Sequence, residues 1–293
     1  MKPYLKRAWA EISLSALEAN IRAISASLQG NTQIMAVVKA DAYGHGEAEI
    51  LQKLTQIGIR YFAVSNLDEA LHVRQYCPDS DVLILGYTPP EYADTLAQNN
   101  IIQGIVSAEY ACTLNARTRT PIRCHVKLDT GMGRIGITGD TPGDCADSIQ
   151  DMSFLRNLKI EGIYTHFAVA DMPDDPEQNA YTEAQKQFIR SVGTELMKRG
   201  VHLKHLHYLN SAGVLYHNDA NSTLARVGII MYGLAPNYPL PVPLDLKPVL
   251  SLKAVISHIK RVQPGTSISY GRTFRADHCM KIATVTVGYA DGY

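Results

Sequence analysis

The chain of 293 residues lacks the features that mark several large classes of protein. Its 28 basic and 28 acidic side chains cancel, so no charge excess predicts binding to nucleic acid or to an acidic membrane surface. No apolar stretch approaches the roughly 20 residues that a membrane-spanning helix needs. The basic residues 2–7 are followed by Glu11 rather than by the apolar segment of a signal peptide. We therefore expect a cytoplasmic protein without nucleic-acid or membrane partners.

Cysteine is also scarce. The five cysteines, at positions 77, 112, 124, 145 and 279, are odd in number and form no C-x-x-C pair. Neither a disulfide framework nor a zinc site is therefore indicated, and a reducing compartment fits this pattern. The apolar share of 46% is, by contrast, large enough for a sizeable core, and the length allows about two domains.

Short apolar runs alternate with helix-like segments between residues 33 and 227. Asn66, followed by Asp68 and Glu69, is typical of a helix start. Eight strands separated by helices predict a (β/α)8 barrel of the TIM type. A doubly wound open sheet is the alternative, although it would usually carry a glycine-rich turn after its first strand. The predicted strands are residues 33–40, 61–65, 82–86, 101–107, 123–129, 159–166, 205–209 and 223–227.

The composition changes after residue 235. Five prolines between residues 236 and 248 predict an ordered linker, and beyond it apolar and polar residues alternate with a period of two. We predict a barrel over residues 1–235, a proline-rich linker over residues 236–248 and a partial all-β domain over residues 249–293. So few strands would leave a sheet short of partners, so we expect the sequence to be a piece of a longer chain.

The most informative segment is Val38-Lys39-Ala40-Asp41-Ala42-Tyr43-Gly44-His45. Its lysine, Lys39, follows the apolar residues 34–38, which are typical of a buried parallel strand. A lysine is rarely buried without a partner, so Lys39 is either salt-bridged or placed for chemistry. A lysine amine can form a Schiff base with pyridoxal phosphate (PLP). The strand context alone leaves both interpretations open.

Other predicted strands also end in polar residues, and the active site of such a barrel lies at the carboxyl ends of its strands. Each residue alone has a plain structural explanation. His166 could be a satisfied core histidine, Arg134 a surface cation and Ser211 a helix cap, while Tyr43 and Tyr270 could be ordinary packing. Their joint occurrence favours a functional site. The strand-end residues are Arg134, His166, Asn210, Ser211 and Arg226, and Gly228 and Ile229 offer backbone N–H groups to a phosphate.

Together these segments resemble the alanine racemase family. Residues 36–46 are similar to its PLP-attachment motif. Six further segments match in order over essentially the whole chain: residues 127–134, 162–167, 210–213, 226–229, 269–273 and 288–292. The resemblance implies a PLP-binding (β/α)8 barrel with a β-domain, a homodimer with shared active sites, and interconversion of L-alanine and D-alanine that supplies D-alanine for peptidoglycan.

The same resemblance implies a role for each matched residue. Lys39 would bind PLP and remove the α-proton of the D-isomer, and Tyr270 of the partner subunit would act on the L-isomer from the opposite face. Arg226, which is a donor only, would face the pyridine nitrogen and weaken PLP as an electron sink. His166 would orient Arg226, and Arg134 would contact PLP and the substrate carboxylate. Tyr43, Ser211, Gly228 and Ile229 would bind the phosphate, Asn210 would also lie at the cofactor, and Lys127 matches a lysine that is often carbamylated and holds the arginine.

Family members run beyond residue 293, where they carry a methionine that contacts substrate and a tyrosine that helps to bind phosphate. The loop 168–171 also differs modestly from the usual form of the family.

Four alternative functions remain open. A non-catalytic PLP-binding barrel would lack the motif around Tyr270, and a PLP-dependent decarboxylase would place an acid where this chain has Arg226. An interaction module would not explain the polar strand ends. Serine racemisation by the same family stays open, because the substrate differs by one hydroxyl.

Overall fold

The computed structural model describes residues 7–235, 239–240 and 244–293. The chain divides into two compact units. One comprises Leu14–Val249, and the other joins the described residues up to Ser13 to Leu250–Tyr293. Within the described residues, no helix has both the length and the apolar character that a membrane crossing requires.

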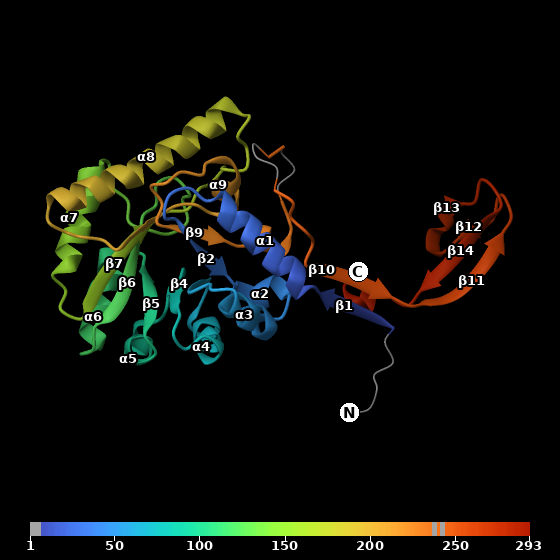
Figure 1. Cartoon of the computed structure of the whole chain (residues 1–293), viewed down its shortest axis with the longest axis horizontal. Coiled ribbons are helices and arrows are strands. Elements are labelled where there is room, and N and C mark those ends of the chain that lie inside the picture. Colours follow the sequence, from blue (N-terminus) through green and yellow to red (C-terminus); the bar gives the residue numbers. More distant parts are fainter. Residues whose placement is uncertain (1–6, 236–238, 241–243) are drawn as a thin grey trace. The chain divides into compact units, whose positions relative to one another are not determined.

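The larger unit is built around one parallel sheet of eight strands (Figure 1). In the order β8-β7-β6-β5-β4-β3-β2-β9, the last strand of the unit returns to pair with the first. Backbone hydrogen bonds from Thr223 N to Leu206 O (2.8 Å) and from Arg226 N to Leu209 O (2.9 Å) link the two outer strands, so the sheet curls into a barrel. The strands are β2 (Gln33–Val37), β3 (Tyr61–Val64), β4 (Asp81–Ile84), β5 (Ile101–Ile105), β6 (Ile122–Lys127), β7 (Leu158–Tyr164), β8 (His205–His207) and β9 (Leu224–Val227).

This architecture confirms the barrel predicted from the sequence, and each of the eight predicted strands is present. The first one ends at Val37 rather than at Ala40, because the chain turns into a short helical segment from Lys39. The predicted helix start at Asn66 is also confirmed, since the Asn66 side chain accepts a hydrogen bond from Glu69 N. The helices are α1 (Leu14–Ser27), α2 (Lys39–Gly44), α3 (Glu47–Gln56), α4 (Leu67–Tyr76), η1 (Pro90–Tyr92), α5 (Ala93–Gln98), α6 (Ala108–Arg117), α7 (Pro142–Ser153), α8 (Pro176–Lys198), α9 (Ser211–Tyr216) and η2 (Ile229–Tyr232).

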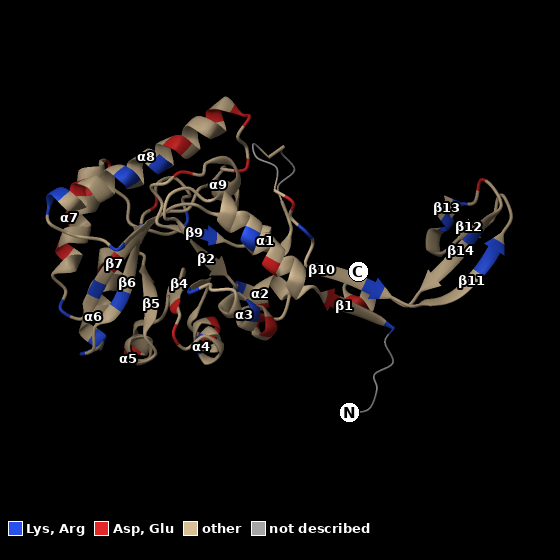
Figure 2. Ribbon diagram, viewed as in Figure 1, with Lys and Arg blue, Asp and Glu red and all other residues tan. Residues whose placement is uncertain are grey.

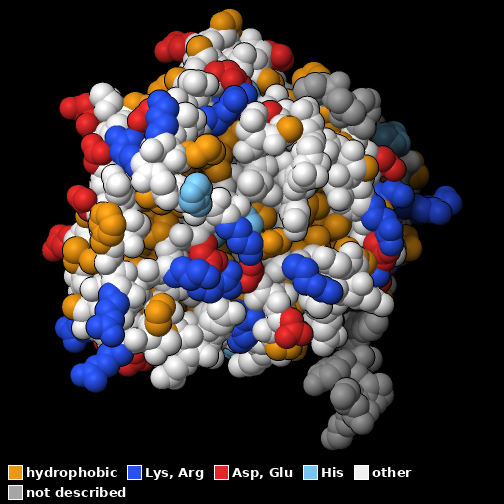
Figure 3. All heavy atoms as spheres, turned by 60° about the vertical axis from the view of Figure 1, so that its left-hand side comes forward, with side chains coloured by type: hydrophobic (Ala, Val, Ile, Leu, Met, Phe, Trp, Pro, Cys, Tyr) orange, Lys and Arg blue, Asp and Glu red, His pale blue; other side chains and the backbone are white. Residues whose placement is uncertain are grey.

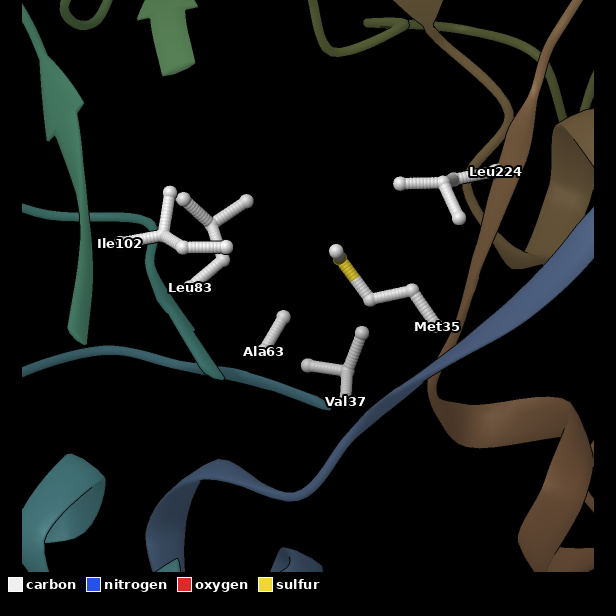
Figure 4. Packing of buried hydrophobic residues seen from close by; sticks show 6 residues of the cluster. All are labelled: Met35, Val37, Ala63, Leu83, Ile102 and Leu224. Atoms are coloured by element: carbon white, nitrogen blue, oxygen red, sulfur yellow. The ribbon is translucent and has the colours of Figure 1, made fainter. Parts of the chain in front are cut away.

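Apolar side chains fill part of the barrel interior, as Figure 4 shows. Alternate residues of a strand point to the same face, so β2 contributes both Met35 and Val37 to this cluster. The strands β3, β4, β5 and β9 contribute one residue each, and all of these side chains are buried. The barrel is thus a packed core rather than a pore. The remaining members of the cluster are Ala63, Leu83, Ile102 and Leu224.

Charged side chains lie along the outer helices, and a group of ion pairs links three strands of the barrel. Basic and acidic segments alternate along α8 in Figure 2, and the face in Figure 3 intersperses both signs, as expected for a chain whose charges cancel. At the amino-terminal ends of the strands, Arg123 on β6 pairs with Asp81 on β4 (2.6 Å) and Glu161 on β7 (2.7 Å). This network ties three strands together at the end of the barrel opposite the carboxyl ends.

The smaller unit consists of antiparallel pairs, which confirms the predicted all-β domain. Residues 1–13 belong to the predicted barrel domain, whereas in the structure β1 (Ala8–Ile12) pairs with β10 (Leu250–Ala254) of the smaller unit. Pairing between strands so far apart in the chain leaves no local sequence signal. Residues 236–238 and 241–243 of the predicted linker lie outside the described residues. The other elements are β11 (Ile256–Val262) with β14 (Met280–Val285), β12 (Ser267–Ile268) with β13 (Phe274–Arg275), η3 (Tyr270–Arg272) and η4 (Tyr289–Asp291).

Candidate active site

A cavity of about 720 Å³ opens at the carboxyl ends of the barrel strands. All of the predicted site residues except Tyr270 line it. Tyr270 lies in η3 of the smaller unit, where its side chain is 91% exposed. The fold therefore brings together side chains from five strand ends that the sequence separates widely. The predicted residues at the cavity are Lys39, Tyr43, Lys127, Arg134, His166, Asn210, Ser211, Arg226, Gly228 and Ile229.

Lys39 begins a turn of unusual backbone conformation. The four residues after it, from Ala40 to Tyr43, have φ angles between 52° and 56°, in the left-handed region, although none is glycine. Such conformations cost about 1–3 kcal/mol per residue and persist where the surroundings enforce them. Glu69 provides such a restraint by accepting from Ala40 N (2.8 Å), and Asp41 Oδ1 accepts from Glu47 N (2.8 Å). The turn lets both Lys39 and Tyr43 line the cavity.

The hydroxyl and amide groups on one side of the cavity are close together. Gly228 N–H donates to Ser211 Oγ (3.1 Å), and a Cβ added at Gly228 would lie 2.9 Å from Tyr43 Oη. Only glycine therefore leaves room for this approach. Asn210 caps α9 by accepting from Gly213 N (2.8 Å), which fixes the position of Ser211. Hydroxyl and backbone N–H groups gathered in this way suit an oxyanion such as phosphate.

Arg226 lies at the centre of the site and is 3% exposed. Its guanidinium donates to the backbone oxygens of Thr165 (2.6 Å), His207 (3.2 Å) and Tyr208 (3.3 Å). It also contacts Nδ1 of His207 at 3.0 Å and Nδ1 of His166 at 3.4 Å. Burial lowers the pKa of Arg226 to about 10, which leaves it charged at neutral pH. All of these acceptors are neutral groups rather than carboxylates.

The two imidazoles beside Arg226 are held in one protonation state. Burial and the charge of Arg226 lower the pKa of His166 to about 3, and the same two causes hold the pKa of His207 well below its ordinary value. Both rings are therefore neutral, and each presents an Nδ1 lone pair to the guanidinium, which leaves the hydrogen on Nε2. For His207, that hydrogen points to Nδ1 of His125, 3.0 Å away. Tyr164 stacks on the His207 ring at 5.1 Å.

Lys127 is a buried cation with a weak partner. Its Nζ donates to Leu128 O at 2.7 Å. Burial, together with the nearby charges of Arg226 and Arg134, lowers the pKa of Lys127 to about 7. Part of the amine population is therefore neutral at physiological pH. A neutral amine is nucleophilic, whereas an ammonium group is not.

Arg134 lies on an exposed stretch of the loop after β6. The preceding turn is organised by Asp129, whose Oδ1 accepts from Gly131 N (3.1 Å) and Gly133 N (2.9 Å). Both glycines have positive φ angles. The folded turn projects Arg134 towards the cavity, on the side where Lys127 lies.

Several residues of the site received no role from the sequence. Thr165 and His207 provide acceptors for Arg226, and Tyr164 lines the cavity and stacks on the His207 ring. Tyr164 and Thr165 directly precede His166, so their position at the same strand end was a usable signal. The histidines of β8, His205 and His207, give no comparable signal, because a histidine in an apolar strand is more often a core residue. Ser65, Leu85 and Asp171 are among the other residues that line the cavity.

The chain is similar to alanine racemases along almost its whole length. The family model described as alanine racemase, N-terminal domain, matches residues 12–236, and that for the alanine racemase C-terminal domain matches residues 249–293. An alanine racemase of Desulfovibrio desulfuricans is 38% identical over 97% of this chain and 76% of that protein. An amino-acid racemase of Enterococcus faecalis is 37% identical over 98% of this chain and 40% of that protein. The solved alanine racemase of Clostridium difficile 630 superposes with a TM-score of 0.86 at 34% identity, covering 99% of this chain and 76% of that one.

Proposed function

The chain belongs to the alanine racemase family, and we propose that it interconverts L-alanine and D-alanine with PLP as cofactor. The observation that carries this proposal is the meeting of Lys39, Arg226 and the Tyr43–Ser211–Gly228 group in one cavity. A two-sided proton transfer by Lys39 and Tyr270 would then invert the α-carbon. D-alanine made in this way would serve peptidoglycan synthesis in the cytoplasm.

The residues at the cavity offer partners that suit the aldehyde and the phosphate of PLP. The Lys39 amine would bind the aldehyde, and the hydroxyls of Tyr43 and Ser211 with the backbone N–H groups of Gly228 and Ile229 would bind the phosphate. When bound, PLP supplies an electron sink for the charge left by removal of the α-proton. The volume of about 720 Å³ lies in the range of small-molecule sites.

Arg226 would face the pyridine nitrogen of PLP. Because a guanidinium is only a donor, that nitrogen would have to remain unprotonated. A carboxylate at this position would instead favour protonation and strengthen the electron sink, as a decarboxylase requires. The hydrogen-bond partners of Arg226 are carbonyl oxygens and imidazoles. This favours an enzyme that moves a proton and breaks no carbon–carbon bond.

Tyr270 would come from the partner subunit of a homodimer. Its side chain is largely exposed on the smaller unit, so it is available to a second copy of the chain. Lys39 would hold or deliver a proton on one face of the substrate and Tyr270 on the other. A base on each face is what inversion requires, because one removes the proton and the other returns it from the opposite side.

Lys127 and Arg134 would act on the carboxylate side of the site. Arg134 would bind the substrate carboxylate and the phenolic oxygen of PLP. The lowered pKa of Lys127 leaves a neutral amine that can react with CO2 to give a carbamate and a proton. A carbamate is an anion, so Lys127 would change from a cation that repels Arg134 into an anion that holds it.

Serine is the second candidate substrate, and the Enterococcus relative bears the broader description of an amino-acid racemase. A pocket that accepts alanine discriminates weakly against a substrate that adds one hydroxyl. The two candidates differ in substrate only and share the residues described above.

The purified chain with PLP should racemise L-alanine faster than L-serine. Borohydride should fix the cofactor covalently on Lys39, as peptide mass spectrometry would show. Lys39→Ala should abolish both the fixation and the racemisation, while Lys198→Ala on the exposed face of α8 should preserve both. Fixation on a different lysine, or racemisation that survives Lys39→Ala, would contradict the assignment.

Tyr270→Phe should slow exchange of the α-proton of L-alanine into deuterated solvent by about 10²–10⁴-fold, the usual contribution of a positioned acid or base. Exchange from D-alanine should fall much less, because Lys39 acts on that isomer. Proton NMR of each isomer measures the two rates. Tyr76→Phe in α4, another exposed tyrosine, serves as the control. Equal losses for the two isomers would argue against the assignment of one base to each face.

In ¹³C-bicarbonate, the chain should show a carbamate resonance that is absent from Lys127→Met. The signal should grow as the pH rises through about 7, because the Lys127 amine loses its proton there and only the neutral form reacts. Lys198→Met, which removes an exposed lysine, should retain it. A carbamate signal of equal size in Lys127→Met would show that a different amine reacts.

A further inference from the structure

Gln185 joins two loops of the site from outside the barrel. It lies in the middle of α8 and is 1% exposed. Its Oε1 accepts from Ala168 N at 3.0 Å, and its Nε2 donates to His166 O at 3.2 Å. The same Nε2 donates to Thr130 Oγ1 at 3.2 Å. One buried amide therefore connects the loop after β6, which contains Thr130, with the loop after β7, which contains His166.

Tyr181 provides a second attachment one helical turn earlier. Its hydroxyl donates to Gly131 O at 2.8 Å. Residues four apart lie on the same face of a helix. Gln185 and Tyr181 therefore reach two adjacent residues of the loop, Gln185 bonding Thr130 and Tyr181 bonding Gly131. A Cβ added at Gly131 would lie 2.4 Å from the Tyr181 hydroxyl, so this approach depends on glycine.

The attached segment leads directly to Arg134. Asp129 closes the turn that contains Gly131, and Thr130 Oγ1 lies 2.7 Å from Thr165 Oγ1. Thr165 O accepts in turn from Arg226. Among the described residues no carboxylate pairs with Arg134, so the position of its side chain depends on the backbone of this loop. The loop is fastened to α8 by the two contacts of Gln185 and Tyr181.

We propose that Gln185 and Tyr181 are positioning residues that hold the Arg134 loop in place and thereby set the affinity for the amino-acid carboxylate. The inference rests on the proposed role of Arg134. A cation that is held in its binding position before the substrate arrives loses less freedom on binding, and the substrate binds more tightly. The two side chains line no part of the cavity and act through the backbone that they hold, which for Gln185 includes His166 O and Ala168 N of the loop after β7.

The test compares Tyr181→Phe and Gln185→Met with the wild type, as the full chain with PLP. Each variant should raise KM for L-alanine two- to tenfold, the size of effect that one hydrogen bond gives, with kcat nearly unchanged. Without cofactor, amide hydrogen exchange over residues 130–135 should accelerate while the barrel strands keep their protection. Tyr181→Phe preserves the fold, because the ring is 45% exposed and only a hydroxyl is lost.

Matched controls distinguish the loop from the helix. Tyr92→Phe removes a hydroxyl from a tyrosine that is 47% exposed in η1, and Gln187→Met changes an exposed glutamine on α8; both should leave KM and exchange unchanged. A fall in kcat with an unchanged KM would indicate a purely structural contact and overturn the proposal. So would unchanged exchange over residues 130–135. If the wild type shows no racemisation, the proposed function fails, while the exchange experiment still decides whether α8 holds the loop.

Discussion

The site depends on a positive charge that is buried without a negative partner. The Arg226 guanidinium is surrounded by backbone carbonyls and by the neutral rings of His166 and His207. A buried charge is tolerated only when hydrogen bonds replace its hydration, and here those bonds come from dipoles. The charge is therefore not neutralised locally. Burial lowers the pKa of His166, His207 and Lys127, and the charge of Arg226 lowers each of them further.

The buried charge of Arg226, which has no carboxylate partner, explains several features of the site. Neutral histidines can accept from Arg226, which fixes their tautomers. A lysine beside the same charge becomes a weak base and a better nucleophile. A PLP nitrogen that faced this donor would stay unprotonated, and the electron sink would be weaker. The barrel makes the arrangement possible, because it brings the ends of β7, β8 and β9 around a single side chain.

Much of the fold and of the candidate site could be predicted from the sequence. The apolar runs predicted the strands, and the polar residues at the strand ends predicted the residues of the cavity, from Lys39 to Ile229. What could not be predicted is non-local. The left-handed turn from Ala40 to Tyr43 contains no glycine, so it has no sequence signature. The pairing of β1 with β10 joins distant segments, and Gln185 looks like any polar residue of an outer helix until its loop partners are known.

The protonation state of the pyridine nitrogen of bound PLP reports directly on whether Arg226 faces it as a charged donor. The chain can be loaded with PLP labelled with ¹⁵N in the ring, and the chemical shift of that nitrogen distinguishes the protonated from the unprotonated form. Because Arg226 can only donate, we expect this nitrogen to be unprotonated between pH 6 and pH 9. A protonated nitrogen in that range would show that Arg226 does not face it as a charged donor and would contradict the role proposed for this arginine.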